Sequence, residues 1–104
     1  MVLVKIFGYL RSIANTSRLE LTGVKTLREV FQKLRETLGD EFINNVFTDF
    51  DSFKVKENII ILQNGKATSN PNQLINENDT IAIMPFLSGG SKTHLLINIM
   101  DSKS

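Results

Sequence analysis

The feature that most constrains the fold is a single amphipathic segment, residues 26–38, whose apolar residues recur every three or four positions. This spacing places them in one stripe along an α-helix. The stripe consists of Leu27, Val30, Phe31, Leu34 and Leu38. Thr26 and Glu29 form a capping-box signature at the start, and Gly39 stands where a C-cap glycine belongs. The pattern therefore predicts one well-bounded helix that must bury one apolar face.

Two strand-like segments precede this helix. Residues 2–9 are rich in Val, Ile, Leu and aromatic residues, and residues 18–21 alternate polar and apolar side chains. Asn15, which lies between them, tolerates a left-handed backbone conformation. The two segments are therefore expected to form an antiparallel hairpin. Tyr9, at the end of the first segment, is expected to be a packed aromatic residue rather than an acid–base group.

Three more strand-like segments follow the helix. Residues 59–62 are an unbroken apolar run that ends at the turn signal Asn64-Gly65. Residues 66–68 fit a short return strand. Residues 80–84 are the last strand-like segment, and Pro85 ends it.

The segment between the helix and these later strands is less regular. Residues 40–53 fit either a short second helix or an apolar loop under the sheet, and their phenylalanines are interpreted as core. The most economical packing of these strands and the helix, in their order along the chain, is an α+β fold. It has a mixed sheet of four or five strands and one main helix across one face. The first and last strands lie side by side in the centre, which is the β-grasp, or ubiquitin-like, arrangement. We expect residues 1–88 to form this domain and residues 89–104 to be a diglycine with a C-terminal extension.

Composition argues against several classes of function. The 104 residues suit one domain, and 12 basic against 11 acidic residues leave no basic stripe, so nucleic acid is not an expected partner. The chain has no cysteine and a single histidine, His94, which argues against a metal site and against a cysteine nucleophile. The apolar N-terminus is interpreted as a strand and not a signal peptide, and no apolar run approaches the ~20 residues that span a bilayer. A cytoplasmic protein without a membrane partner is expected.

Several motifs follow one another along the chain. Residues 4–14 resemble the first strand of a known protein family and the "LRELAG"-like turn that follows it. Residues 26–30 resemble the start of that family's helix, and residues 62–66 resemble its "VNG" hairpin. Residues 74–84 match an "L-x-DGDEVAIF" segment, and residues 85–90 match a terminal "PPVSGG". In this order and at this spacing, the chain resembles the MoaD/ThiS family of ubiquitin-like sulfur carriers, which includes small archaeal ubiquitin-like modifiers.

The resemblance implies a carrier subunit rather than a catalyst. In this family an E1-like enzyme uses ATP to adenylate the carboxylate of the last glycine, and the carrier itself binds no cofactor. The adenylate is then converted into a thiocarboxylate, or an amine captures it as an isopeptide. The matching residue here is Gly90, preceded by Gly89, and neither has a Cβ that would obstruct a narrow pocket next to ATP. The molybdopterin synthase large subunit is a further implied partner.

The residues before the glycine pair have two alternative roles. Phe86 and Leu87, together with Ser88, are expected to dock onto the partner protein. In the alternative, the two apolar residues cap the hydrophobic core. Gly90 is not the last residue, because residues 91–104 follow it. An internal glycine has no carboxylate, so carrier chemistry requires a processing protease that removes this extension.

Three functions therefore stay open. The first is a sulfur carrier resembling the small subunit of molybdopterin synthase, with a Gly90 thiocarboxylate after residues 91–104 are removed. The second is a protein modifier that is joined to target lysines through Gly90. The third is a non-covalent interaction module in which the glycine pair is a turn. In that case residues 94–100, which are mostly apolar, form an additional edge strand or a partner-binding segment.

Overall fold

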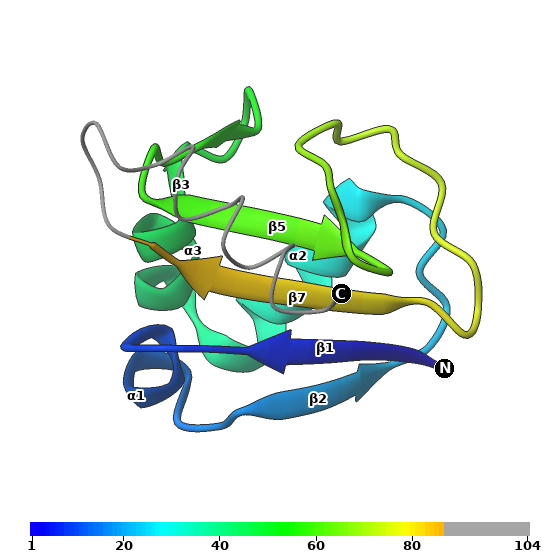
Figure 1. Cartoon of the computed structure of the whole chain (residues 1–104), viewed down its shortest axis with the longest axis horizontal. Helices are drawn as coiled ribbons and strands as arrows, with labels where there is room; N and C mark the ends of the chain where they lie inside the picture. The colour runs from blue at the N-terminus through cyan, green and yellow to red at the C-terminus, as the bar shows by residue number, and fades with distance from the viewer. Residues whose placement is uncertain (87–104) are drawn as a thin grey trace, which may run out of the picture.

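The computed structural model describes residues 1–86, which form a five-stranded mixed sheet covered on one face by helices, and a separate two-stranded sheet (Figure 1). The strand order is β2-β1-β7-β5-β6 in the larger sheet and β3-β4 in the smaller one. In chain order the elements are β1 (Val2–Ile6), α1 (Leu10–Ala14), β2 (Arg18–Leu21), α2 (Leu27–Leu38), α3 (Asp40–Val46), β3 (Phe47–Asp49), β4 (Lys54–Val55), β5 (Ile59–Gln63), β6 (Lys66–Ala67) and β7 (Thr80–Pro85).

The first and last strands, β1 and β7, lie side by side in parallel at the centre of the main sheet. Their register pairs Leu3 with Thr80 and Ile6 with Ile83. On the outer side of each, β2 pairs with β1 and β5 pairs with β7, both antiparallel. This is the β-grasp arrangement, so the predicted α+β fold with a mixed sheet is confirmed.

Helix α2 begins and ends where its sequence signals predict. The Thr26 Oγ1 accepts a hydrogen bond of 3.2 Å from the Glu29 N–H, and Gly39, with φ +95°, follows the last turn. The Glu29 carboxylate accepts from the Lys25 N–H at 2.8 Å, one residue earlier than in the usual capping box. The buried stripe consists of Leu27, Val30, Phe31 and Leu34.

The connection between β1 and β2 differs from the predicted hairpin. The two strands are antiparallel as expected, but β1 ends at Ile6 and the short helix α1 lies between them. Leu10 and Ala14 anchor α1 in the core, and Asn15, with φ +59°, closes it in the left-handed conformation. A helix of five residues is too short to show a helical period in sequence, which explains why it was missed.

Residues 40–53 combine a helix with an unpredicted hairpin. Of the two alternatives, the short second helix is the one observed, as α3. The β3–β4 hairpin then carries Phe50 and Phe53, whose rings lie 5.8 and 5.3 Å from the Arg28 guanidinium carbon. That guanidinium also donates to the carbonyls of Phe50 and Asp51. Arg28 therefore fastens the hairpin to the start of α2.

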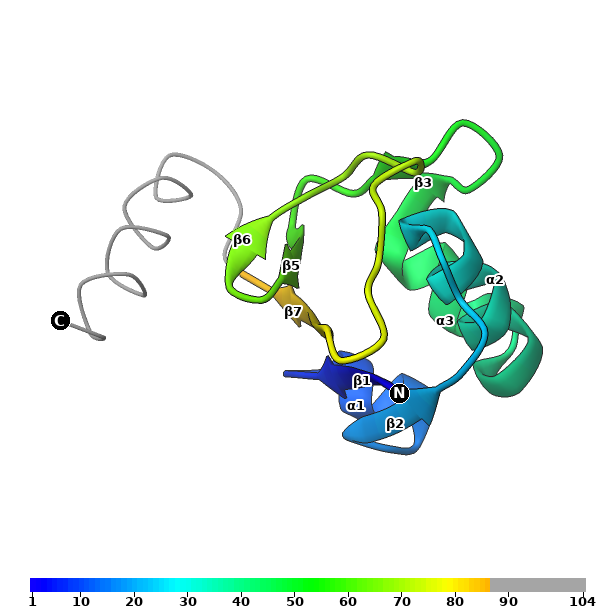
Figure 2. The ribbon, with the colours of Figure 1, turned by 90° about the vertical axis from the view of Figure 1, so that its right-hand side faces the viewer.

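The core lies between the sheet and the helices α2 and α3, which pack against the same face (Figure 2). Alternate residues of the central strands point into it, and Val4, Ile6, Ile81 and Ile83 are almost completely buried. None of the helices within residues 1–86 is long and apolar enough to cross a membrane.

One buried carboxylate fixes the start of β7. The Asp79 oxygens accept hydrogen bonds of 2.8 Å from the Asn76 N–H, the Asn64 Nδ2 and the Gln63 Nε2. The backbone bond from Asn76, followed by the side-chain bonds from Asn64 and Gln63, lowers the pKa of Asp79 below its ordinary value, although burial opposes this shift. Asp79 thus ties β7 to the β5–β6 turn in its ionised form.

Replacing Asp79 with Asn should lower the free energy of unfolding by about 2 kcal/mol near neutral pH, because the amide cannot accept all three bonds. Since the native pKa is depressed, the stabilisation is complete above the unfolded-state pKa of about 3.9 and is lost as pH falls through the native value. Urea denaturation of both proteins over this range measures the difference. The exposed Asp51→Asn is the control. A wild-type advantage that does not shrink in acid would contradict this role.

Candidate functional site

The candidate site is the root of the C-terminal tail, Pro85 and Phe86, at the end of β7. Because β1 and β7 run parallel, their carboxyl ends meet at the same edge of the sheet. The turn that follows β1 therefore lies beside the tail root. Its first residue, Phe7, donates its N–H to the Ile83 carbonyl at 3.0 Å and extends the pairing beyond β1.

Asn58, the residue before β5, connects both sides of this root. Its carbonyl accepts the Phe86 N–H at 2.9 Å, and its side-chain amide donates to the Tyr9 hydroxyl at 3.1 Å. Tyr9 is 46% exposed, so the prediction that it is a packed aromatic is wrong. Its ring lies at the surface, and its hydroxyl serves as a hydrogen-bond partner for the segment that holds the tail.

Gly8 allows the turn after β1 to approach the tail root closely. Its φ is +64°, and a Cβ added there would lie 2.6 Å from the Pro85 Cγ and 3.0 Å from the Cδ. Real Cβ atoms do not approach other atoms this closely, so any side chain at this position would displace the proline ring. Glycine is required here both for its backbone conformation and for the space it leaves.

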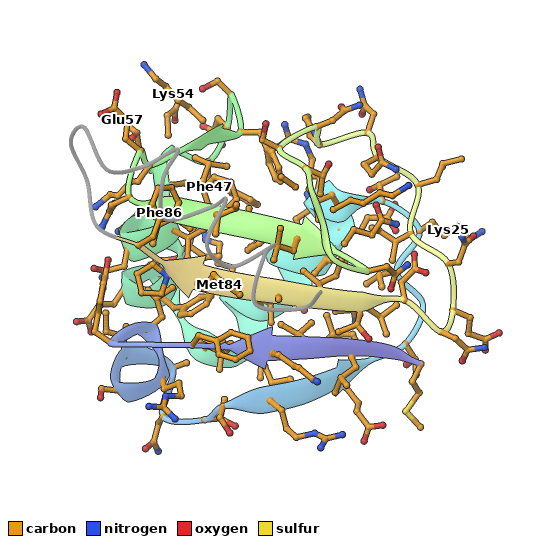
Figure 3. All side chains as sticks on the ribbon, viewed as in Figure 1. Lys25, Phe47, Lys54, Glu57, Met84 and Phe86 are labelled. Carbon is orange, nitrogen blue, oxygen red and sulfur yellow. The ribbon has the colours of Figure 1, made fainter. Side chains whose placement is uncertain are left out.

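Phe86 is the only predicted site residue within residues 1–86. It is partly buried and follows Met84 by two positions, which places the two side chains on the same side of an extended strand (Figure 3). Met84 alternates with the core residue Ile83 and so faces away from the helices. This orientation favours docking over capping of the core, although the docking role itself stays a prediction.

The other predicted site residues lie outside the described residues. They are Leu87, Ser88, Gly89 and Gly90. The same holds for His94 and for the domain boundary predicted after residue 88. Within residues 1–86 no group of three or more His, Cys, Asp or Glu side chains is placed to hold a metal ion. The groups gathered at the tail root are a phenol, an amide and backbone atoms, which position a chain rather than activate a nucleophile.

The motif that ends in the glycine pair is shared with a known family. The family model described as "ThiS family" matches residues 4–90, which span the whole β-grasp sheet and end at Gly90. The chain belongs to the ThiS family. The resemblance to ubiquitin-like sulfur carriers predicted from its motifs is therefore confirmed. A comparison with curated protein sequences gave no significant match.

Solved structures agree with the membership in the ThiS family. The small archaeal modifier protein 1 from Methanosarcina acetivorans is 30% identical with a TM-score of 0.69, covering 86% of this chain and 95% of its own. Urm1 from Sulfolobus solfataricus is 29% identical with a TM-score of 0.63, covering 81% and 99%. A structure of the BexX/CysO complex from Amycolatopsis orientalis is similar in fold, at 20% identity and a TM-score of 0.68 over 86% and 100%.

Sequence reasoning missed the residues that hold the tail root in this ThiS-family chain. Gly8, Tyr9 and Asn58 come from separate segments, and the Asn58–Tyr9 bond joins positions 49 residues apart. No local pattern signals such a contact. Only Pro85, the residue that ends the last strand, marked the place where the tail begins.

Substitution of Gly8 by Ala should destabilise the fold more than substitution of Gly23 by Ala. Both glycines have positive φ, +64° and +75°, so each variant loses about 1–2 kcal/mol from backbone strain. Only Gly8 also contacts Pro85, which adds about 1–3 kcal/mol of overpacking, whereas nothing lies within 4 Å of the Gly23 position. Chemical denaturation of both variants gives the comparison. Equal losses would show that the contact with the tail root is unimportant.

Proposed function

We propose that this chain is a ubiquitin-like sulfur carrier whose reactive group is the carboxylate of Gly90, exposed when residues 91–104 are removed. The observation that carries this proposal is the short stretch of chain between the edge of the sheet and the residue where the family match ends. The ThiS-family match stops at Gly90, and the Phe86 N–H, four residues before it, donates to the Asn58 carbonyl at the sheet edge. Four residues span about 14 Å, which is long enough to carry a terminal glycine away from the domain into a partner's pocket.

The chemistry assigned to Gly90 is acyl activation and sulfur transfer. An E1-like enzyme joins the Gly90 carboxylate to the α-phosphate of ATP and releases pyrophosphate. Hydrosulfide, or a donor that supplies sulfur at the same oxidation level, then displaces AMP and leaves a thiocarboxylate. This chain contributes no catalytic side chain to these steps, and ATP is bound by its partner. Its contribution is a fixed tail root at Pro85–Phe86 and two terminal residues without Cβ atoms.

The partners and location follow from this role. The E1-like enzyme is expected to contact the tail root, with Phe86, Leu87 and Ser88 as the docking residues. A protease that cleaves after Gly90 must act first. The large subunit of molybdopterin synthase is a proposed partner of the loaded carrier, and the cytoplasm is the proposed compartment, in keeping with a chain that has no cysteine to oxidise.

Protein modification through Gly90 is the second candidate. The relative that is 30% identical is itself described as a small archaeal modifier protein. A modifier uses the same adenylate, but a lysine amine of a target protein displaces AMP and forms an isopeptide bond. The two functions share every residue described above, so only the product distinguishes them.

Intact-mass measurement of the protein isolated from its native cell tests the proposal. We expect a species that ends at Gly90, together with one heavier by the replacement of oxygen by sulfur. Conjugates that disappear when Gly90 is deleted would select the modifier instead. Full-length protein alone, with no conjugates, would contradict both and leave the non-covalent interaction module.

A further inference from the structure

The face of the main sheet turned away from the helices, here called the outer face, is apolar at its centre. Its side chains alternate with the core residues along three neighbouring strands. The apolar members of the outer face are Leu3, Phe7, Ile60, Leu62, Ala82 and Met84. Phe7 is 41% exposed, Leu62 is 9% exposed, and the other four are partly buried. No helix within residues 1–86 covers this face (Figures 1 and 2).

The strand register joins five of these side chains into one surface, whereas Leu3 lies beside Thr80 and is separated from Phe7 by Lys5. Ile60 lies opposite Met84 and Leu62 lies opposite Ala82 across the β5–β7 ladder. On the other side of β7, Lys5 lies beside Ala82, and the same register continued by two residues places Phe7 beside Met84. Side chains opposite each other on neighbouring strands lie about 5 Å apart. A contiguous apolar surface of this kind marks a site that another segment or protein covers.

We infer that residues 94–100 of this same chain cover the outer face in the unprocessed protein. Five of these seven residues are apolar: Leu95, Leu96, Ile97, Ile99 and Met100. Polar residues flank them on both sides, at 91–93 and 101–104. A short apolar segment with polar ends matches an apolar surface of limited extent, because burial of both removes unfavourable contact with water.

The chain has the length and the turning point that this arrangement needs. Phe86 follows the outer-face residue Met84 by two positions, so the tail starts at the edge of the outer face (Figure 3). Residues 87–93 span up to about 25 Å when extended, whereas a strand of six residues such as β7 is about 20 Å long. Gly89 and Gly90 lie within this connection and permit the sharp reversal that brings the segment back over the sheet.

Tethering favours this occupant over a separate molecule. A segment joined by a short connection has an effective concentration in the millimolar range at its own domain, well above that of most free partners. The inference concerns the unprocessed chain, so it stands whether or not Gly90 proves to be the reactive residue. If the extension is removed as proposed above, the same cleavage uncovers the outer face and frees the Gly90 carboxylate.

Paramagnetic NMR on the full chain tests this inference. Because the chain has no cysteine, Ser102→Cys gives a unique position for a nitroxide label just beyond the segment. We expect the methyl signals of Ile60, Leu62 and Met84 to lose most of their intensity, while those of Leu34 and Ile43 on the helical side keep theirs. A label at Glu36→Cys, on the exposed surface of α2, provides the reference pattern for the opposite side.

Two variants and one mixing experiment decide the outcome. Adding Ile97→Asp to the labelled chain should restore the outer-face signals, and the matched Asn98→Asp should not. Signal loss spread over both faces, or confined to the edge strands β2 and β6, would overturn the inference. It would also be overturned if isotope-labelled chains lost these signals only when mixed with separate nitroxide-labelled chains, since a second copy would then be the occupant.

Discussion

Parallel hydrogen bonding between β1 and β7 brings the first and last strands together at the centre of the sheet, and the other features depend on this pairing. It aligns the carboxyl ends of both strands, so the turn after β1 lies against the residue that ends β7. Gly8 can then contact Pro85, and Asn58 can hold both Tyr9 and Phe86. In this β-grasp domain the tail therefore starts at a fixed point on one edge of the sheet, beside the turn that follows β1.

The elements that could be predicted from the sequence are those marked by hydrophobic periodicity or by turn-forming residues. The stripe and caps of α2, the apolar runs of β5 and β7 and the left-handed Asn15 were all visible in local patterns. Helix α1 was missed because five residues do not display a helical period, and the β3–β4 hairpin was missed because it includes Phe53 at φ +58°, a conformation that large side chains seldom adopt. Contacts across the tail root were out of reach because they join distant segments.

The tail root and the outer face lie next to each other and serve one function in the proposed carrier. The tail root fixes where the tail begins at the edge of the sheet, and within residues 1–86 no helix covers the apolar outer face next to it. A carrier must offer a partner both a reactive end and a surface that the partner can recognise. In the proposed function, the extension beyond Gly90 blocks the reactive end, because it keeps the glycine carbonyl in an amide. In the arrangement inferred above it also covers the second, so processing would release both together.

In the proposed function, Gly90 becomes chemically competent only as a free carboxylate. ATP–pyrophosphate exchange by the E1-like enzyme of the same cell tests this claim most directly, with the chain ending at Gly90 compared with the full-length chain. Exchange is expected with the shortened chain and not with the full-length one. Exchange that is equal for both chains, or absent with the shortened chain, would contradict this claim.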